Sequence, residues 1–142
     1  MDSKIVELLI STAKEKRLNA HCPYSHYMVG AAVLGEDGKI YGGCNIENVS
    51  YGGTVCAERV ALFSMVAAGC KKFTAIAIAT GDDDDGAPCC ICRQVMLEFC
   101  SSLDLPVYMS GPAGKVYEHT LREIAPYPFM AFDPNSDYAV KK

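Results

Sequence analysis

Two short cysteine motifs, about thirty residues apart, place the strongest constraint on how this chain can fold. Cys56 belongs to the first motif, and Cys89 and Cys92 belong to the second. Thiolates are preferred ligands of zinc, so we expect the fold to bring both segments to one Zn²⁺ ion. Three protein ligands leave the fourth tetrahedral position open, which is typical of catalytic rather than structural zinc sites.

The spacing within and around the motifs supports this interpretation. Cys89 and Cys92 are three residues apart, so a helix that begins there presents both sulfurs on one face. Glu58 follows Cys56 by two residues and is expected to move protons to and from water at the open zinc position. The alternative for Glu58 is a first-turn glutamate that only complements the helix dipole. Arg59 is expected to donate hydrogen bonds to the thiolates, with a surface ion pair as its alternative.

Other residues near the motifs receive simpler interpretations. Arg93 is a second candidate donor to the sulfurs, ranked after Arg59. Cys90 is rotated away from the face that carries its two neighbouring ligands, so we do not expect it to bind zinc. The aspartates over 82–85 lack the alternation of an EF-hand and predict a solvated loop. The remaining cysteines are interpreted as small buried hydrophobic residues, namely Cys22, Cys44, Cys70 and Cys100.

Composition and charge limit the class of partner. The chain has 142 residues, 50% of them hydrophobic, and a net charge of -4. These values suit one domain over 1–142, and the acidic balance argues against nucleic acids, which are bound through Lys and Arg. Charges interrupt the apolar positions near the N-terminus, and no apolar run is long enough to cross a bilayer. With eight cysteines expected to be thiols or metal ligands, the sequence predicts a cytoplasmic protein with no membrane partner.

Hydrophobic periodicity predicts alternating helices and strands. The expected helices span 3–17, 56–68 and 89–101, with Pro88 in the first turn of the third, and a short last helix follows a capping box of Thr120 and Glu123. The expected strands span 27–34, 39–44, 73–80 and 105–109, with a further short strand after them. Strands separated by helices predict an α/β fold in which a mixed sheet is covered on both faces.

On these motifs the chain resembles the small, three-cysteine, homotetrameric class of cytidine deaminases, from about residue 24 to residue 129. The matching stretches are Pro23-Tyr24-Ser25, Val29-Gly30-Ala31-Ala32, Gly43-Cys44-Asn45-Ile46-Glu47-Asn48, Cys56-Ala57-Glu58-Arg59 and Pro88-Cys89-Cys90-Ile91-Cys92-Arg93-Gln94. The resemblance implies a three-layer α/β/α sandwich with a sheet of about five strands. It also implies zinc-dependent hydrolytic deamination of the free nucleosides cytidine and 2′-deoxycytidine, with release of ammonia, in pyrimidine salvage.

The resemblance further implies roles for individual residues. Cys56, Cys89 and Cys92 would bind one zinc ion per subunit, and Glu58 would be the proton shuttle. Asn45 and Glu47 would hold the ribose 3′-hydroxyl, since an amide and a carboxylate can meet a hydroxyl as donor and acceptor. Tyr27 and the Ala57 backbone would contact the base, and the Ala87 carbonyl would contact the departing amine. Gln94 would support the water on the metal. Tyr51 and Phe129 would reach into the pocket of a neighbouring subunit. Plain core or interface packing is the alternative for Tyr51 and Phe129, and Cys90 stands where the family usually has Gly.

Other functions remain as alternatives. The loop over 51–55 resembles the deaminase of the modified nucleoside blasticidin S, although Asn45 and Glu47 favour an ordinary ribose, and a panel of substrates distinguishes the two. A non-catalytic zinc-stabilised interaction module would need a fourth ligand and has no use for Glu58. A thiol redox protein would form a disulfide between Cys89 and Cys92. Nucleic-acid editing is disfavoured because the chain is short and acidic and its motif begins with Cys instead of His.

Overall fold

A mixed sheet of five strands forms the centre of the protein in the computed structural model, which describes residues 1–83 and 85–130. Residues 84 and 131–142 lie outside the described part, and with them Asp84 of the acidic run and the last part of the domain expected over 1–142. The helices are α1 (Ser3–Arg17), α2 (Ala57–Ala67), α3 (Cys90–Phe99) and α4 (Leu121–Ile124), with a 3₁₀ turn at Tyr51–Gly53. The strands are β1 (Gly30–Gly35), β2 (Ile40–Cys44), β3 (Phe73–Ala79), β4 (Pro106–Ser110) and β5 (Val116–Thr120).

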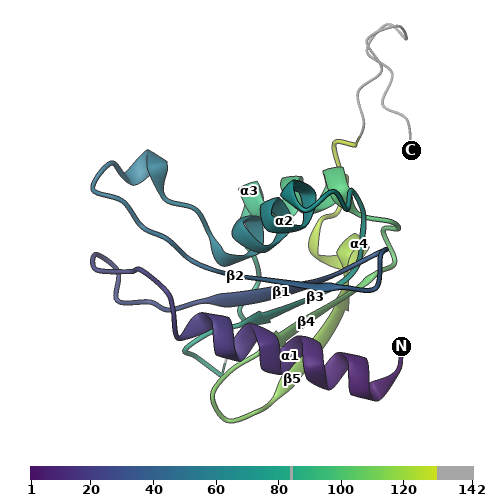
Figure 1. The fold of residues 1–142 in the computed structure, drawn as a ribbon, viewed down its shortest axis with the longest axis horizontal. Helices are drawn as coiled ribbons and strands as arrows, with labels where there is room; N and C mark the ends of the chain where they lie inside the picture. The colour runs from purple at the N-terminus through teal and green to yellow at the C-terminus, as the bar shows by residue number, and fades with distance from the viewer. Residues whose placement is uncertain (84, 131–142) are drawn as a thin grey trace, which may run out of the picture.

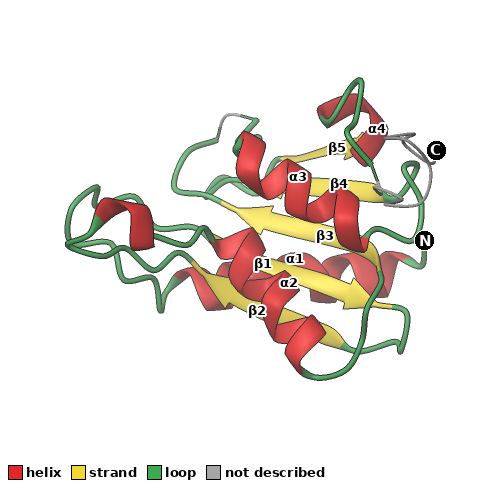
Figure 2. Ribbon diagram, turned by 90° about the horizontal axis from the view of Figure 1, so that it is seen from above, coloured by secondary structure: helices red, strands yellow, loops and turns green. Residues whose placement is uncertain are grey.

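The sheet lies between two layers of helices, which confirms the α/β sandwich predicted from the sequence. The strand order is β2-β1-β3-β4-β5, with β3 and β4 parallel and the other neighbours antiparallel. Helix α1 packs on one face, and α2 and α3 cover the other (Figure 1). Seen from above, α2 and α3 lie side by side over the sheet (Figure 2). No helix among the described residues combines the length and the apolar character that a bilayer crossing requires.

Alternation along the central strand separates two hydrophobic clusters. Ile76 and Ile78 of β3 point into the cluster under α2 and α3, whereas Ala75 and Ala77 point into the cluster under α1. Successive side chains of a strand face opposite sides of the sheet, so the larger residues fill the side that carries the cysteine motifs. The small residues on the other side let α1 pack close to the sheet.

Most predicted boundaries differ from the observed ones by one or two residues, and two of the differences have a clear structural cause. The first strand begins at Gly30 and not at Tyr27, because the Asn45 side chain takes the backbone hydrogen bonds of the preceding segment at Tyr27 and Val29. Pro88 was expected inside the first turn of its helix, but Cys89 is the N-cap residue with an extended backbone, so Pro88 lies before the helix. The capping box of Thr120 and Glu123 is confirmed.

Helix α2 rests directly on the backbone of β2 at Gly43. A Cβ atom there would lie 2.5 Å from the Ala61 amide nitrogen and 2.7 Å from the Ala57 carbonyl oxygen. We expect Gly43→Ala to lower the free energy of unfolding by about 1–3 kcal/mol, because overpacking forces α2 away from the sheet. Chemical denaturation measures this, with Gly52→Ala as control, since no atom lies within 4 Å of a Cβ at Gly52. Equal unfolding midpoints for the two variants would contradict the expected contact.

Candidate metal centre and active site

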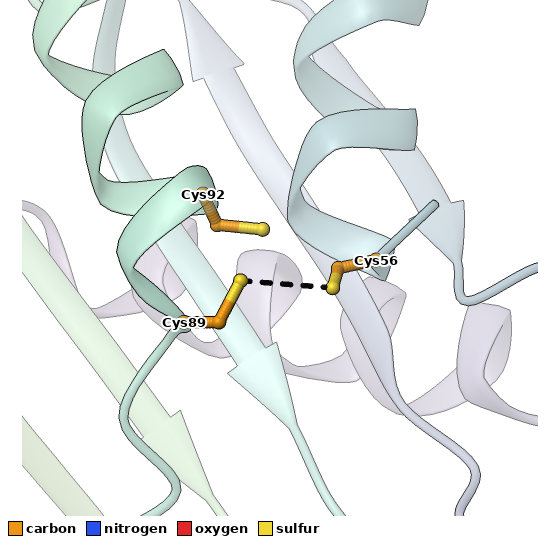
Figure 3. Close-up of side chains that lie close together, drawn as sticks. All are labelled: Cys56, Cys89 and Cys92. Atoms are coloured by element: carbon orange, nitrogen blue, oxygen red, sulfur yellow. Dashed lines mark hydrogen bonds between the residues drawn. The ribbon is translucent and has the colours of Figure 1, made fainter. Parts of the chain in front are cut away.

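Three cysteine sulfurs converge where α2 and α3 begin. Cys56 and Cys89 are the N-cap residues of these helices, and Cys92 lies in the first turn of α3. Their sulfurs all lie within 4.8 Å of one another, and those of Cys56 and Cys89 are 3.8 Å apart. Figure 3 shows the three side chains directed toward one another from the two helix starts. Tetrahedral Zn–S bonds of about 2.3 Å separate two sulfur ligands by roughly 3.8 Å, so the arrangement fits zinc.

The donor set leaves one tetrahedral position free of protein ligands. Within the described residues, no fourth His, Cys, Asp or Glu joins the three cysteines. Cys90 is exposed and lies outside the group, as expected from its rotation on the helix. All eight cysteines are free, so the described structure contains no disulfide between Cys89 and Cys92. A structural zinc site is usually closed by a fourth Cys or His, so this set is typical of a catalytic site.

Positive charge beside the sulfurs comes from Arg59. Its Nη2 donates to the Cys56 sulfur at 3.6 Å, and its buried Nε has no acceptor among the described residues. Hydrogen bonds from the Cys92 thiol, and then from Arg59, hold the pKa of Cys56 below its usual range although burial opposes the shift. Arg93 instead donates to the carbonyls of Pro88 and Ile124, both at 2.7 Å. Of the two candidate arginines, only Arg59 is brought to a sulfur, where it offsets thiolate charge.

Glu58 lies one helical position beyond the start of α2 and is almost completely buried, with 5% of its surface exposed. Burial raises the pKa of Glu58 to about 7, and the nearby Cys56 sulfur contributes in the same direction. A carboxyl group with a pKa near neutrality can both accept and release a proton at neutral pH. This environment suits an acid–base residue better than a solvated glutamate at a helix N-terminus.

A cavity of about 310 Å³ connects the cysteine cluster with the loops before β1 and after β2 and β3. Seven of the predicted site residues line the cavity: Tyr27, Asn45, Glu47, Cys56, Ala57, Glu58 and Ala87. The other lining residues are Ser25, Val29, Thr54, Ile78, Thr80 and Gly86. Its volume lies at the lower end of the range found for small-molecule pockets.

The end of the cavity away from the cysteines is polar. Glu47 accepts hydrogen bonds from the backbone amides of Tyr24 and Ser25 and from the Ser25 hydroxyl. The hydrogen bond from the Ser25 side chain is the main cause that lowers the pKa of Glu47, so this group is a carboxylate and only accepts. Partial burial raises the pKa of Tyr27, whose hydroxyl faces Thr80.

Six predicted residues do not line this cavity. Cys89, Cys92 and Arg59 belong to the adjacent sulfur cluster, whereas Tyr51, Phe129 and Gln94 lie elsewhere. Tyr51 is 75% exposed and packs edge-on against Tyr24, with ring centroids 5.6 Å apart. Phe129 is 59% exposed and lies with Gln94 and Cys90 in a separate groove beside α3. The Gln94 amide donates to the Phe129 carbonyl at 2.8 Å, so in this structure Gln94 binds the backbone at Phe129.

Sequence reasoning gave no role to Ser25 or Thr80, although both line the cavity. Ser25 orients Glu47 from 22 residues away, and Thr80 binds the Asp82 carbonyl at 2.9 Å. No spacing rule connects residues so far apart in the chain. The only available signal was that Ser25 stands in the stretch Pro23-Tyr24-Ser25, which is shared with the family that the sequence resembles.

Comparisons with known proteins show the family of this chain. A family model, described as the cytidine and deoxycytidylate deaminase zinc-binding region, matches residues 3–105. The cytidine deaminase of Sporosarcina psychrophila is 44% identical over 128 residues, which cover 90% of this chain and 93% of that protein. The cytidine deaminase of Halalkalibacterium halodurans is 43% identical over 129 residues, which cover 91% of this chain and 97% of that protein.

Solved structures show the same likeness in three dimensions. The cytidine deaminase of Burkholderia pseudomallei superposes with a TM-score of 0.83 at 42% identity, covering 91% of this chain and 100% of that one. The cytidine deaminase of Mycobacterium tuberculosis superposes with a TM-score of 0.75 at 34% identity, covering 89% of this chain and 98% of that one. Because the family model spans most of the chain and relatives above 40% identity align over at least 90% of it, the chain belongs to the cytidine deaminase family.

Proposed function

We propose that this protein catalyses the zinc-dependent hydrolysis of cytidine and 2′-deoxycytidine to the corresponding uridines, with release of ammonia, as a step of pyrimidine salvage. The observation that carries the proposal is the burial of Glu58 beside a three-cysteine cluster, in one cavity with Asn45 and Glu47. A structural zinc module has no use for this carboxylate. The same polar pair supports an ordinary ribose over the modified nucleoside blasticidin S.

Proton movement is assigned to Glu58. Zinc held by the three sulfurs supplies Lewis-acid chemistry that lowers the pKa of water. Glu58 accepts a proton from the water that attacks C4 and delivers it to ring nitrogen N3. As the C4–N bond breaks, Glu58 takes the remaining proton of the new C4 hydroxyl and transfers it to the departing amine, which leaves as ammonia while the C4 carbonyl forms. Arg59 offsets the negative charge of the thiolates, so that this charge does not raise the free-energy barrier of the reaction.

Positioning of the nucleoside is assigned to the polar end of the cavity. Asn45 already uses its Oδ1 for the Val29 amide and one Nδ2 hydrogen for the Tyr27 carbonyl. Its second Nδ2 hydrogen remains to donate to the ribose 3′-oxygen, while the 3′-hydroxyl donates to Glu47. Tyr27 and the Ala57 backbone contact the base, and the Ala87 carbonyl accepts from the departing amine. These contacts hold C4 over the metal centre and lower the entropic barrier.

Asn45→Asp is expected to raise the KM for cytidine about tenfold and to lower the free energy of unfolding by about 1–3 kcal/mol. Aspartate can still accept from the Val29 amide but cannot donate to the Tyr27 carbonyl, so two acceptors face each other where a partly buried hydrogen bond was. Steady-state kinetics and chemical denaturation measure both effects. Asn48→Asp is the control, because Asn48 is exposed and its Oδ1 only accepts from the Ser50 amide at 2.9 Å. Similar effects at both positions would contradict the assignment.

The direct test of the function is incubation of zinc-loaded protein with cytidine, followed by the change of the ultraviolet spectrum to that of uridine and by ammonia release. We expect turnover of cytidine and 2′-deoxycytidine and much weaker turnover of blasticidin S and cytosine-containing oligonucleotides. Absence of ammonia release from both nucleosides would refute the proposal. Preferential turnover of blasticidin S would replace it with the alternative substrate.

Quaternary structure and location belong to the same proposal. We assign a homotetramer in which Tyr51 and Phe129 pack at a neighbouring subunit's cavity, supported by large exposed apolar side chains at Val49, Tyr51, Ile91 and Phe129. The loops around the 3₁₀ turn also extend beyond the end of the sheet (Figure 2). Light scattering should give four times the mass of the 15.3 kDa chain, and a monomer would contradict this.

The proposal also includes a single domain over 1–142 and a cytoplasmic location. A reducing compartment of this kind keeps the thiols free.

A further inference from the structure

The acidic loop after β3 forms one wall of the cavity. Thr80, Gly86 and Ala87 all line the cavity, and Ala87 is followed directly by Pro88 and the zinc ligand Cys89. The position of this short loop therefore sets the shape of this part of the cavity wall. The described aspartates of the loop, Asp82, Asp83 and Asp85, are not among the lining residues, and the proposed reaction gives them no role.

Two of these aspartates bind the hairpin of β4 and β5 instead of standing free in solvent. The Asp83 carboxylate accepts from the Ala113 amide at 2.7 Å, and the Tyr117 hydroxyl donates to the Asp83 carbonyl at 3.3 Å. Gly111 allows this contact, because a Cβ there would lie 2.2 Å from the Asp82 carbonyl oxygen. The loop consequently rests on the backbone of the hairpin at one end.

Asp85 connects the hairpin to the cavity wall itself. Its Oδ2 lies 2.8 Å from Nε2 of His119, a residue of β5, and its carbonyl accepts from the Ala87 amide at 2.8 Å. The same residue is therefore bound through its side chain to the sheet and through its backbone to a cavity-lining residue. His119 is in turn held on the edge strand β5, in register opposite the buried Val107 of β4.

We propose that Asp85 and His119 are positioning residues that hold the Ala87 wall of the cavity in the conformation that binds the nucleoside. The inference rests on the proposed function and deepens it. Both side chains are partly exposed, 41% for Asp85 and 34% for His119, and exposed pairs contribute little to global stability. The effect of the pair is local, because Asp83 anchors the start of the loop whereas Asp85 anchors the end that continues into Ala87, so the pair acts on nucleoside affinity more than on folding.

The test is a set of Asp85→Ala, His119→Ala and the double variant in the zinc-loaded protein. Each should raise the KM for cytidine about three- to fivefold and change kcat less than about twofold, and the double variant should be no worse than either single one. His119→Gln keeps a donor for Asp85 and should restore most of the lost affinity. The control pair is Asp104→Ala and Arg122→Ala, which removes an equally short exposed ion pair at 2.8 Å whose residues do not line the cavity.

Hydrogen exchange at the Ala87 amide provides a readout that needs no activity. Exchange should be faster in the Asp85 and His119 variants than in the wild type and unchanged in the Asp104 and Arg122 variants. An unchanged KM, strictly additive effects, or an equal rise of KM in the control pair would overturn the inference. If the wild type failed to deaminate cytidine, the proposed function would fall, while unchanged Ala87 exchange in the variants would separately show that the pair does not hold the wall.

Discussion

Glu58→Gln is expected to retain zinc and fold but to lose roughly 10²–10⁴-fold in kcat, the usual contribution of one general acid–base group. Glutamine has the same shape and fills the same buried position, but its amide cannot accept a proton from water or deliver one to the ring. Because the carboxyl group of Glu58 is already disfavoured as an anion by burial, its replacement should cost little stability. The measurements are kcat, zinc content and thermal unfolding of the same preparation.

Glu7→Gln is the matched control for this variant. Glu7 lies on α1, is exposed, and does not line the cavity. Its kcat should equal that of the wild type within error. A Glu58→Gln protein with full zinc occupancy and near-normal kcat would falsify the assigned proton transfer. Loss of zinc in that variant would show instead that Glu58 supports the metal centre.

Cys89→Ala should lower zinc affinity by more than about 100-fold, beyond what loss of a supporting residue around a metal causes, and should abolish turnover. Only two sulfurs would then remain at the site, fewer than the three protein ligands of a catalytic zinc. Zinc binds the folded state, so a chelator should lower the unfolding temperature of the wild type but leave that of Cys89→Ala unchanged. Metal analysis of the purified proteins and thermal unfolding with and without chelator give both results.

Cys90→Ala is the control, because Cys90 is the next residue on the same helix and is exposed outside the sulfur cluster. It should keep one zinc ion per chain and the activity of the wild type. Retention of zinc by Cys89→Ala, or its loss from Cys90→Ala, would reverse the assignment of the ligands.

The elements predicted most accurately from sequence were those stabilised by neighbours along the chain. Helix α1 matches its predicted range, and the capping box at Thr120 is formed within four residues. The error at Tyr27 has a different origin. The segment before β1 is bound by Asn45, 16 to 18 residues away, and a strand pattern contains no information about such a partner.

The metal centre could be predicted in part from local spacing, whereas the contacts at the polar end of the cavity could not. Cys89 and Cys92 could be paired from their spacing, because a helix fixes the relative position of residues three apart. That Cys56 joins them depends on α2 and α3 starting side by side over the sheet. The contacts of Ser25 with Glu47 and of Asp85 with His119 span 22 and 34 residues and obey no local rule.

Residue types and short spacings were thus sufficient to indicate the chemistry, since ligand preference, helical periodicity and capping act over a few neighbouring residues. Packing of the helices on the sheet determined the rest: which sulfurs meet, how deeply Glu58 is buried, and which loops form the cavity wall. These properties depend on close contact between distant segments, and close-packed interiors arise only when all the layers are assembled.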